Sequence, residues 1–364
     1  METKKTSLSH IHEILGAKMI SFAGYLMPVQ YEGVTSEHLN VRENVGVFDV
    51  SHMGEFIVRG PGSLELVQMI TSNDASTLPI GKVQYSCFPN GKGGIVDDLL
   101  VYRLNELTYM LVVNASNIEK DWNWLMQHNI GGVDIENISE QTSLLAVQGP
   151  KACQAIQSLT NMSLSDMKYY TFQKGVFAGI ENILISTTGY TGAGGFEIYF
   201  KNEDAEYVWN AIFEAGKDCH IQPTGLAARD TLRLEMGFCL YGNDIDETTS
   251  PIEAGLSWIT KFTNNFIDSA FLKEQKELGC KKCLVGFEII DRGVPRNGYS
   301  VVDESGNKIG LVTSGTMSPS LNKGIGLAYI PHSMKTHGTE IFIQVRKKKL
   351  KAKVVSLPFI KNKL

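Results

Sequence analysis

The sequence predicts an α+β protein built from several domains, and three observations lead to this fold class. The chain has 364 residues, which is enough for about two or three domains of ordinary size. Short runs rich in Val, Ile, Leu and Tyr are interspersed with stretches of helical spacing over most of the chain. From about Lys282 onward the pattern changes to short strands between Gly-, Ser-, Pro- and Asn-rich turns. This last segment is typical of a separate small β-barrel or sandwich.

Strand-like and helical runs can be assigned in order along the first part of the chain. The runs predicted as strands, from their short length and their apolar and aromatic residues, are 93–102, 108–113, 144–147, 182–187 and 196–200. The runs predicted as helices, from their apolar spacing, are 117–128, 205–215 and 225–236. Single helices among strands favour α+β lobes over a helical bundle. We expect the boundary to the last segment in a charged linker at 273–282.

Composition excludes several classes of protein. Hydrophobic residues make up 43% of the chain and charged residues 20%, which is enough apolar material to offset the entropy of ordering, so a mainly disordered protein is not expected. The formal net charge of -5 gives no general attraction to nucleic acid. No stretch reaches the ~18 apolar residues that a membrane helix needs. We therefore expect neither nucleic acid nor a membrane as a partner.

The N-terminal residues and the cysteines favour a reducing, cytoplasmic location. The first residues have neither the apolar core of a signal peptide nor the Arg- and Ser-rich character of a transit peptide. The six cysteines are too sparse for a disulfide scaffold. Cys280 and Cys283 form a single C-x-x-C pair without the second pair of ligands that zinc needs, and there is no HExxH motif. We expect no metal site.

Two adjacent aspartates, Asp97 and Asp98, lie inside an apolar strand-like run. Side chains alternate along a strand, so one of the two shares a face with Ile95 and Leu99 and the other points to the opposite face. A carboxylate that faces an apolar interior is costly unless it is paired, and its pKa rises, which suits a group that exchanges a proton near neutral pH. The alternative is an edge strand whose aspartates meet solvent or cap a turn.

A glycine-rich loop at residues 188–195 joins two predicted strands. Its glycines allow positive φ or a close approach to a ligand. The loop could present Tyr190 as a stacking surface for a flat heterocycle, or it could be an ordinary hairpin. In the next strand, Glu197 lies opposite the apolar face of Phe196 and Ile198. Its carboxylate could accept two hydrogen bonds from a guanidine-like heterocycle, or it could lie on a solvated strand face.

Two groups of cations have both a functional and a structural interpretation. Arg229 and Arg233 share one helical face. They need either an anionic ligand or acidic neighbours such as Asp230 and Glu235, which would form a surface salt-bridge network. The basic stretch 346–353 is either an edge strand protected by lysines or a docking patch for an acidic protein partner.

Taken together, the motifs resemble the glycine cleavage system T protein family, which are aminomethyltransferases. Each motif is unspecific alone, but they occur in order over nearly the whole chain. They are Gly16-Ala-Lys-Met19 with Phe22-Ala-Gly24 and Met27-Pro-Val-Gln-Tyr31; Phe48-Asp-Val-Ser-His-Met-Gly-Glu55; Gly93-Gly-Ile-Val-Asp-Asp-Leu99; Ala146-Val-Gln-Gly-Pro150; Thr188-Gly-Tyr-Thr-Gly192; Gly225-Leu-Ala-Ala-Arg-Asp230; Tyr241-Gly-Asn243; and Thr313-Ser-Gly315 with Ser318-Pro-Ser320.

The resemblance implies a three-domain cloverleaf of two intertwined α/β lobes and a C-terminal β-barrel. The expected division is 1–50 with 140–275 for a folate-binding first lobe, 51–139 for a second lobe that carries Asp98, and 276–364 for the barrel. The resemblance also implies a monomer with a central tetrahydrofolate site. Enzymes of this family move the one-carbon unit of an aminomethyl group, carried on the lipoyl arm of H protein, to tetrahydrofolate. The products are 5,10-methylenetetrahydrofolate, ammonia and dihydrolipoyl H protein.

The resemblance also implies roles for single residues. Asp98 matches the catalytic carboxylate near the reacting folate nitrogens, where it could stabilise an iminium-like centre, orient the nitrogen or shuttle its proton. Glu197 matches the pterin-binding acid, and Arg229 matches a substrate-contacting arginine. The residues in further pocket motifs of the family are Tyr85, Asn114, Tyr190 and Met53, the last with His52 beside it.

Three positions depart from the family pattern. Tyr25 replaces the usual Trp, and Ala193 and Gly194 replace the frequent Glu-Asp of the glycine-rich loop, which leaves the polar contacts of that loop tip open. Near the C-terminus, Lys361 or Lys363 stands where many members have a basic residue after Pro-Phe. Whether either of them contacts folate also stays open.

Three alternative functions remain at this point. A folate-binding relative that assists iron–sulfur assembly shares the fold but carries a KGC-Y-x-GQE motif, which is missing here. A demethylase, or the folate-binding tail of an amine-oxidising enzyme, normally follows a flavin domain, for which 364 residues leave no room. A non-catalytic module that binds through the basic C-terminal strand predicts salt-sensitive protein binding without folate dependence.

Overall fold

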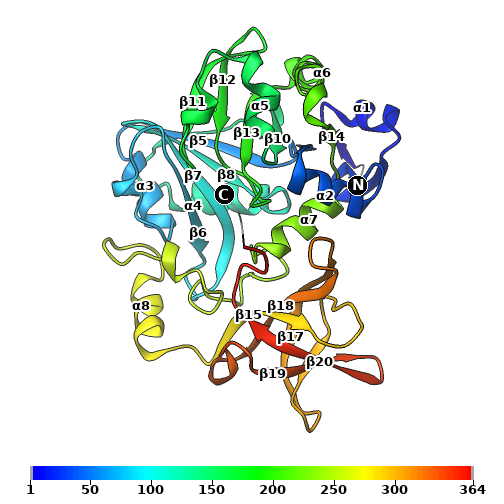
Figure 1. The fold of residues 1–364 in the computed structure, drawn as a ribbon. Helices are drawn as coiled ribbons and strands as arrows, with labels where there is room; N and C mark the ends of the chain where they lie inside the picture. Colours follow the sequence, from blue (N-terminus) through cyan, green and yellow to red (C-terminus); the bar gives the residue numbers. More distant parts are fainter. Residues whose placement is uncertain (1–2, 362–364) are drawn as a thin grey trace.

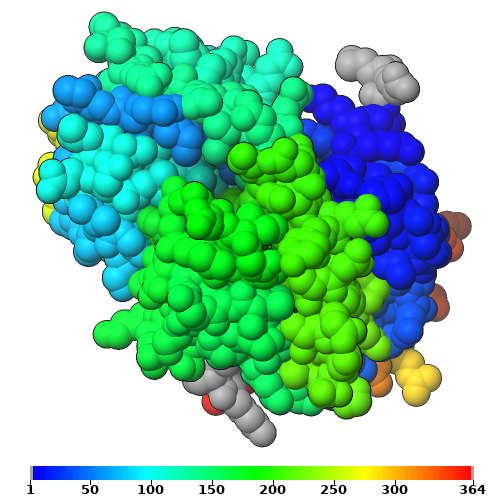
Figure 2. All heavy atoms as spheres, turned by 90° about the horizontal axis from the view of Figure 1, so that it is seen from above, coloured from blue at the N-terminus to red at the C-terminus, as the bar shows by residue number. Residues whose placement is uncertain are grey.

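Two large β-sheets flanked by helices form the upper part of the molecule, and a closed β-barrel lies below them (Figure 1). The structure is a computed structural model and describes residues 3–361. Seen from above, segments from the N-terminal, second and middle parts of the chain (blue, cyan and green) meet on one face (Figure 2). Among the described residues, no helix is both long and apolar enough to cross a membrane.

The first large sheet has six strands in the order β11-β12-β13-β10-β4-β14. The strands are β4 (Val45–Asp49), β10 (Thr142–Gln148), β11 (Phe172–Phe177), β12 (Ile180–Ser186), β13 (Gly195–Lys201) and β14 (Ile221–Pro223). Neighbours are antiparallel except β14, which runs parallel to β4. One face packs on α5 (Ala152–Ile156) and α6 (Ala205–Ala215). Helix α6 forms there because Val208, Trp209 and Ile212 recur at helical spacing and bury one apolar stripe.

The second large sheet has five antiparallel strands in the order β6-β7-β8-β5-β9. The strands are β5 (Gly54–Arg59), β6 (Val83–Pro89), β7 (Ile95–Asn105), β8 (Thr108–Val113) and β9 (Asp134–Asn137). Helices α3 (Ser63–Ile70) and α4 (Ile118–His128) pack on one face and share its core. Because β7 lies between β6 and β8, the edge-strand interpretation of Asp97 and Asp98 is wrong.

The two large sheets are intertwined in the chain. Strand β4 belongs to the six-stranded sheet but precedes every strand of the five-stranded sheet, and β10 to β14 follow them. A small sheet in the order β1-β3-β2 comes before both. Its strands and the neighbouring helices are β1 (Lys4–Lys5), β2 (Lys18–Phe22), β3 (Tyr25–Gln30), α1 (Ser9–Ile14), α2 (Val34–Glu43) and α7 (Leu226–Glu235).

The C-terminal segment is a closed six-stranded barrel, β15-β18-β17-β16-β19-β20. Its strands are β15 (Lys282–Ile289), β16 (Ser300–Val302), β17 (Lys308–Ser318), β18 (Lys323–Pro331), β19 (Glu340–Val345) and β20 (Lys348–Val355). The interior is filled by alternating side chains of these strands, such as Val285, Phe287 and Ile289 of β15. The predicted α+β class and the C-terminal barrel are therefore confirmed.

Two expectations about the C-terminal part hold only in part. The expected linker is mostly helical, because α8 (Ser269–Leu278) occupies much of it and anchors itself through the buried Leu272, and the barrel begins at Lys282. The basic stretch is an edge strand over Lys348–Leu350, which pair with β19 alone, whereas Ala352 and Lys353 also pair with β15. Its cations are exposed and partly paired, as Lys351 is with Glu340 at 2.7 Å.

The strands and helices predicted for the first part of the chain are all present within a few residues of their expected ends. Strand β8 and helix α6 have the predicted bounds. Helices α1, α2, α3 and α5 were not predicted, and three of them have ten or fewer residues with weak or mixed apolar spacing. These short helices are stabilised by packing against the rest of the protein rather than by their own pattern of apolar residues.

Candidate active site

A cavity of about 1090 Å³ lies between the two large sheets, next to α7 and the loop that follows it. The residues singled out from the sequence come from separate elements, and all of them line this cavity. They are Met53, Tyr85, Asp98, Asn114, Tyr190, Glu197 and Arg229. Apolar side chains such as Phe48, Val50 and Leu100 form much of the remaining wall. The cavity is large enough for a small organic ligand.

Asp98 is held on the cavity wall by two hydrogen-bond donors. Strand alternation turns Asp98 toward the cavity and turns Asp97 to the opposite face, where Asp97 is fully buried. The Tyr85 hydroxyl donates to Asp98 Oδ2 at 2.8 Å, and Asn114 Nδ2 donates to Asp98 Oδ1 at 2.9 Å. Tyr85 comes from the neighbouring strand β6, and Asn114 directly follows β8. Both oxygens of the carboxylate are thus fixed in direction.

The surroundings of Asp98 raise its pKa to about 7. Burial is the largest cause, and the negative charge of Asp97 is the second, while the hydrogen bonds from Tyr85 and Asn114 act in the opposite direction. A carboxyl group with this pKa is partly protonated at neutral pH. It can therefore accept or release a proton there, as a general acid or base requires.

Glu197 lines the same cavity as Asp98 but belongs to β13 of the six-stranded sheet. Its neighbours Phe196 and Ile198 point into the core behind β13, so Glu197 points the opposite way, into the cavity. The Thr188 hydroxyl donates to Glu197 Oε2. Burial raises the pKa of Glu197, and the bond from Thr188 and the charge of Arg229 oppose that rise. The solvated-face interpretation is wrong, because this carboxylate lines an enclosed wall.

Arg229 and Tyr190 form a pair on the α7 side of the cavity. The Arg229 guanidinium lies over the Tyr190 ring, 4.6 Å from its centroid. The Tyr190 ring stacks on Phe238 with centroids 5.9 Å apart, and its hydroxyl donates to the Cys239 carbonyl oxygen. Within residues 3–361, no ion pair joins Arg229 to an acidic side chain. Its donors are therefore available to a ligand.

Arg233, one turn further along α7, has a different environment. It is buried and pairs with Asp230 at 2.8 Å and with Asp244 at 2.7 Å. Its Nη2 also donates to Ser314 of the barrel at 2.9 Å. The two arginines therefore do not form the surface network considered above: Arg233 ties α7 to the barrel, and Arg229 faces the cavity.

The glycine-rich loop forms part of the cavity wall, and one of its glycines lies very close to the side chain of Met236. Gly192 has φ +64°, and a Cβ there would lie 2.5 Å from Met236 Cγ. A residue with a side chain would therefore need both a strained backbone and a displaced Met236. Gly194 also lines the cavity, whereas Ala193 is packed into the core beside it.

Other residues considered from the sequence lie elsewhere. His52 is buried but is not part of the cavity wall, and its Nδ1 has no hydrogen-bond partner among the described residues. Burial, followed by the charge of Arg229, lowers the pKa of His52 to about 4, so it is neutral. Lys361 is exposed. Lys363 lies outside the described residues.

Sequence reasoning missed several residues around the site. Gln148 and Tyr241 line the cavity and stand in motifs quoted above, but no role was assigned to them. Asp121 of α4 is fully buried behind Asp97. A signal for it exists, because Asp121 occupies the apolar stripe of the helical pattern, four residues before the buried Leu125.

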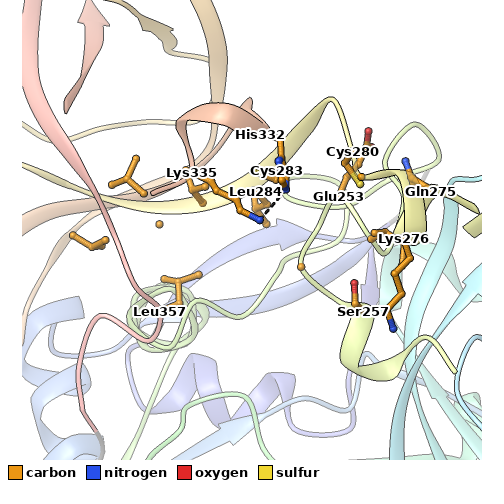
Figure 3. A pocket seen from close by; sticks show the side chains of 17 residues that line it. Glu253, Ser257, Gln275, Lys276, Cys280, Cys283, Leu284, His332, Lys335 and Leu357 are labelled. Carbon is orange, nitrogen blue, oxygen red and sulfur yellow. Dashed lines mark hydrogen bonds between the residues drawn. The ribbon is translucent and has the colours of Figure 1, made fainter. Parts of the chain in front are cut away.

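A second cavity of about 440 Å³ contains the C-x-x-C pair (Figure 3). It lies against β15 and α8 and shares Gly255, Leu284 and Leu357 with the central cavity. Burial raises the pKa of both Cys280 and Cys283, which leaves them as neutral thiols. In the part of the chain that the structure describes, no group of three or more His, Cys, Asp or Glu side chains could hold a metal ion.

The charged groups around the cavity are placed so that they can bind a ligand and exchange a proton with it. One wall offers a carboxyl group that titrates near neutral pH, and the facing sheet offers a second carboxylate. Helix α7 offers a guanidinium that forms no ion pair with an acidic side chain in the described part of the chain. The second carboxylate can grip adjacent N–H groups of a flat heterocycle. The first can then exchange a proton with a group placed further along the same ligand. Such an arrangement can bind a flat polar ligand and exchange a proton with it.

The chain is similar to known proteins over nearly its whole length. The family model described as "GCVT N-terminal domain" matches residues 8–264, and "Glycine cleavage T-protein C-terminal barrel domain" matches residues 282–361. A protein of Flavobacterium psychrophilum named aminomethyltransferase is 65% identical over 359 residues and covers 99% of this chain and 100% of its own length. The protein of the same name from Bacteroides fragilis is 59% identical over 360 residues, which are 98% of this chain and 100% of that protein. The crystal structure of the glycine cleavage system aminomethyltransferase T from Bartonella henselae matches with TM-score 0.92 and 36% identity over 98% of both chains.

Proposed function

This chain belongs to the glycine cleavage T-protein family and is an aminomethyltransferase, and we propose that its two substrates are tetrahydrofolate and the aminomethylated lipoyl arm of an H protein. The carbon–sulfur and carbon–nitrogen bonds of the aminomethyl group break, and two carbon–nitrogen bonds to folate form. The two protons displaced from the folate nitrogens leave with the lipoyl sulfur and with ammonia. The reaction therefore balances without a metal, oxidant or reductant.

One observation carries the proposal for the folate site. The residues that match the family's pocket motifs come from β6, β7, β13, α7, two loops and the position directly after β8, yet they line one cavity. We propose that the pterin ring binds beside Glu197, whose carboxylate accepts hydrogen bonds from the ring N–H and amino groups. Arg229, which forms no ion pair with an acidic side chain of the described residues, then donates to an acceptor group of the substrate. Tyr190, Tyr85, Asn114 and Met53 complete the wall.

Asp98 is proposed as the catalytic residue of the transfer. Its two hydrogen bonds fix the carboxylate, and its pKa of about 7 lets it hold or release a proton at physiological pH. Proton exchange with the reacting folate nitrogen fits this pKa. The same carboxylate, when ionised, also stabilises an iminium-like carbon through its charge.

Several further features of the protein are part of the proposal. We propose that H protein is the docking partner, that the enzyme is a monomer, and that it works in the cytoplasm, where its six free thiols suit a reducing medium. We also propose that the structural units are 1–50 with 140–275, 51–139 and 276–364. The strand orders of the two sheets and the barrel support this division.

The test is the anaerobic formation of 5,10-methylenetetrahydrofolate from tetrahydrofolate and aminomethylated H protein. We expect product with the wild-type enzyme and almost none with Asp98→Asn. H protein that lacks its lipoyl group is the matched control and should give none. Measurable folate binding without product from the wild type would contradict the proposed substrate pair, and the demethylase and assembly-factor alternatives would then be tested with the same protein.

A further inference from the structure

A row of three carboxyl groups runs from the cavity into the protein behind Asp98. Asp97 follows on the buried face of β7, and Asp121 of α4 lies against Asp97. Asp97 and Asp121 are both 0% exposed. Charges buried this deeply must be paired or neutralised. The hydrogen bonds that each carboxyl group receives therefore decide whether it is protonated.

The donors around the two buried carboxyls are distributed unequally. Asp97 receives hydrogen bonds from the Asn114 backbone N–H at 2.9 Å, from Asn114 Nδ2 at 2.9 Å and from Asn117 Nδ2 at 2.7 Å. Neither oxygen of Asp121 receives a hydrogen bond from an N–H or O–H group within residues 3–361. Two facing carboxylates without a proton would repel each other in a dry environment. A proton must lie between them, and it belongs to Asp121, because Asp97 is already stabilised as an anion by three donors.

Asn114 links this buried pair to the cavity. One amide nitrogen, Asn114 Nδ2, donates to Asp97 Oδ1 and to Asp98 Oδ1, both at 2.9 Å. This orientation requires Asp97 to act purely as an acceptor. A protonated Asp97 would instead favour the flipped amide, which turns its oxygen toward Asp97 and withdraws a donor from Asp98.

We propose that Asp121 is a positioning residue of the active site: it carries a proton, donates it in a hydrogen bond to Asp97, and thereby holds Asp97 and Asn114 in the arrangement that fixes Asp98. Asp121 does not touch the cavity and is not a catalytic residue. The inference concerns the state of the buried pair and rests on the proposed function only for its kinetic test.

The charges around the row agree with this assignment. Burial, followed by the charge of Asp97, raises the pKa of Asp121 to about 11, so the group is neutral at physiological pH. Lys120 opposes this rise but is itself bound to the Tyr241 hydroxyl at 2.8 Å. The other titratable groups that face the row are Tyr85 and Cys87 of β6, and Cys239 and Tyr241 of the loop after α7.

The first test detects the proton directly and needs no substrate. Infrared difference spectra of wild type minus Asp121→Asn, recorded at about pH 8 where ordinary carboxyls are ionised, should show the C=O band of a protonated carboxylic acid in the wild type. Glu119→Gln, an exposed carboxylate two residues earlier on α4, is the matched control and should leave that band in place. Absence of the band from the wild-type difference would overturn the proposal.

The second test separates a positioning role from a structural one by kinetics. Asp121→Ala removes the donor to Asp97, so kcat should fall at least tenfold, folate affinity should stay within twofold, and the inflection of the kcat–pH profile should move toward acid. Without that donor Asp97 is protonated more readily, so its charge contributes less to the pKa of Asp98. The charge of Asp97 raises the pKa of Asp98 more than the Asn114 hydrogen bond lowers it, so the net shift is toward acid even if the amide flips. Asp121→Asn keeps an N–H donor and should restore both kcat and the inflection.

An Asp121→Ala enzyme with the wild-type pH profile and kcat would overturn the proposal, as would an Asp121→Asn enzyme as impaired as the alanine variant. If Asp121→Ala does not fold, the asparagine variant and the infrared spectra decide alone. If the wild type itself makes no product, the proposed function fails. The infrared spectra still test whether Asp121 carries a proton.

Discussion

The Tyr85 hydroxyl donates a hydrogen bond of 2.8 Å to Asp98 Oδ2, and the two residues come from neighbouring strands, β6 and β7. This bond favours the ionised carboxylate and so limits the rise in the pKa of Asp98 that burial and Asp97 cause. The Tyr85 ring also packs beside Trp258, with centroids 5.9 Å apart. The hydroxyl and the ring of Tyr85 therefore have separable effects.

Tyr85→Phe removes the hydroxyl but keeps the ring in place. Because a hydrogen bond to the charged form lowers a pKa, its loss should raise the pKa of Asp98 above its present value of about 7. The inflection of the kcat–pH profile should move toward alkaline pH by about one to two pH units, since a hydrogen bond to a charged group contributes about 1.5–3 kcal/mol. Steady-state rates between acid and alkaline pH provide the measurement. An inflection that stays in place would mean that Asp98 does not control the rate.

Asp98→Asn removes the titratable group while keeping its size and one hydrogen-bond acceptor. The variant should fold and bind folate with nearly unchanged affinity, because the cavity wall keeps its shape. Turnover should fall by roughly 100- to 10,000-fold, the usual contribution of a positioned acid or base. Single-turnover formation of methylenetetrahydrofolate, compared with folate affinity from calorimetry, separates the two effects. Turnover within tenfold of wild type would remove the proposed catalytic role.

Glu197→Ala should act mainly on folate binding. The pterin ring would lose its charged acceptor, and its N–H groups would be left without a partner, which costs about 1.5–3 kcal/mol or roughly 10- to 150-fold in affinity. Titration calorimetry with tetrahydrofolate under anaerobic conditions measures this. Glu181→Ala, an exposed glutamate on β12, is the control and should bind like the wild type. Equal affinity of the Glu197 variant would place the pterin elsewhere in the cavity.

Strand alternation around Asp98 and Glu197 could be predicted from the sequence, because a period of two is a local property of the chain. The hydrogen-bond partners of these carboxylates could not be predicted from the sequence. The bond from Tyr85 depends on the register between β6 and β7, and the contact of Asp121 with Asp97 depends on how α4 packs on the sheet. Such contacts are set by tertiary packing, and a single sequence contains no direct record of them.

The surroundings of Arg229 and Arg233 also depend on tertiary packing and could not be predicted from the sequence. The i, i+4 spacing placed Arg229 and Arg233 on one face of α7, but it could not show that the barrel covers only Arg233. The short helices α1 and α5 likewise owe their formation to the sheets beneath them rather than to a strong apolar period. Local patterns singled out Asp98, Tyr190, Glu197 and Arg229 as candidates with alternatives left open, whereas Tyr85, Asn114 and Met53 came from the family resemblance alone.

Glu235, near the end of α7, joins α2 and the barrel to the centre of the molecule. Its Oε2 accepts hydrogen bonds from Arg42 Nη2 at 2.9 Å and from Ser320 at 2.8 Å, and it lies 3.1 Å from His38 Nε2. Its Oε1 accepts from Ser318 at 2.5 Å. Burial alone would raise the pKa of Glu235, but His38, Ser318 and Arg42 outweigh it and lower the pKa to about 2.

Glu235→Gln should therefore destabilise the protein in a pH-dependent way. Loss of the charge leaves Arg42, whose side chain is 12% exposed, without its charged partner, so the free energy of unfolding at neutral pH should fall by about 3 kcal/mol, the lower end of the range for a buried pair. Because the folded pKa lies below the unfolded value of 4.5, the carboxylate stabilises the fold fully above pH 4.5, and this contribution is lost as the pH falls toward 2. The difference between wild type and variant should shrink over that range in denaturant titrations. Glu140→Gln, which breaks the exposed pair with Lys4, should change stability by less than about 1 kcal/mol at any pH. A difference for Glu235→Gln that is equally small at neutral pH, or that stays constant down to pH 2, would contradict the assigned network.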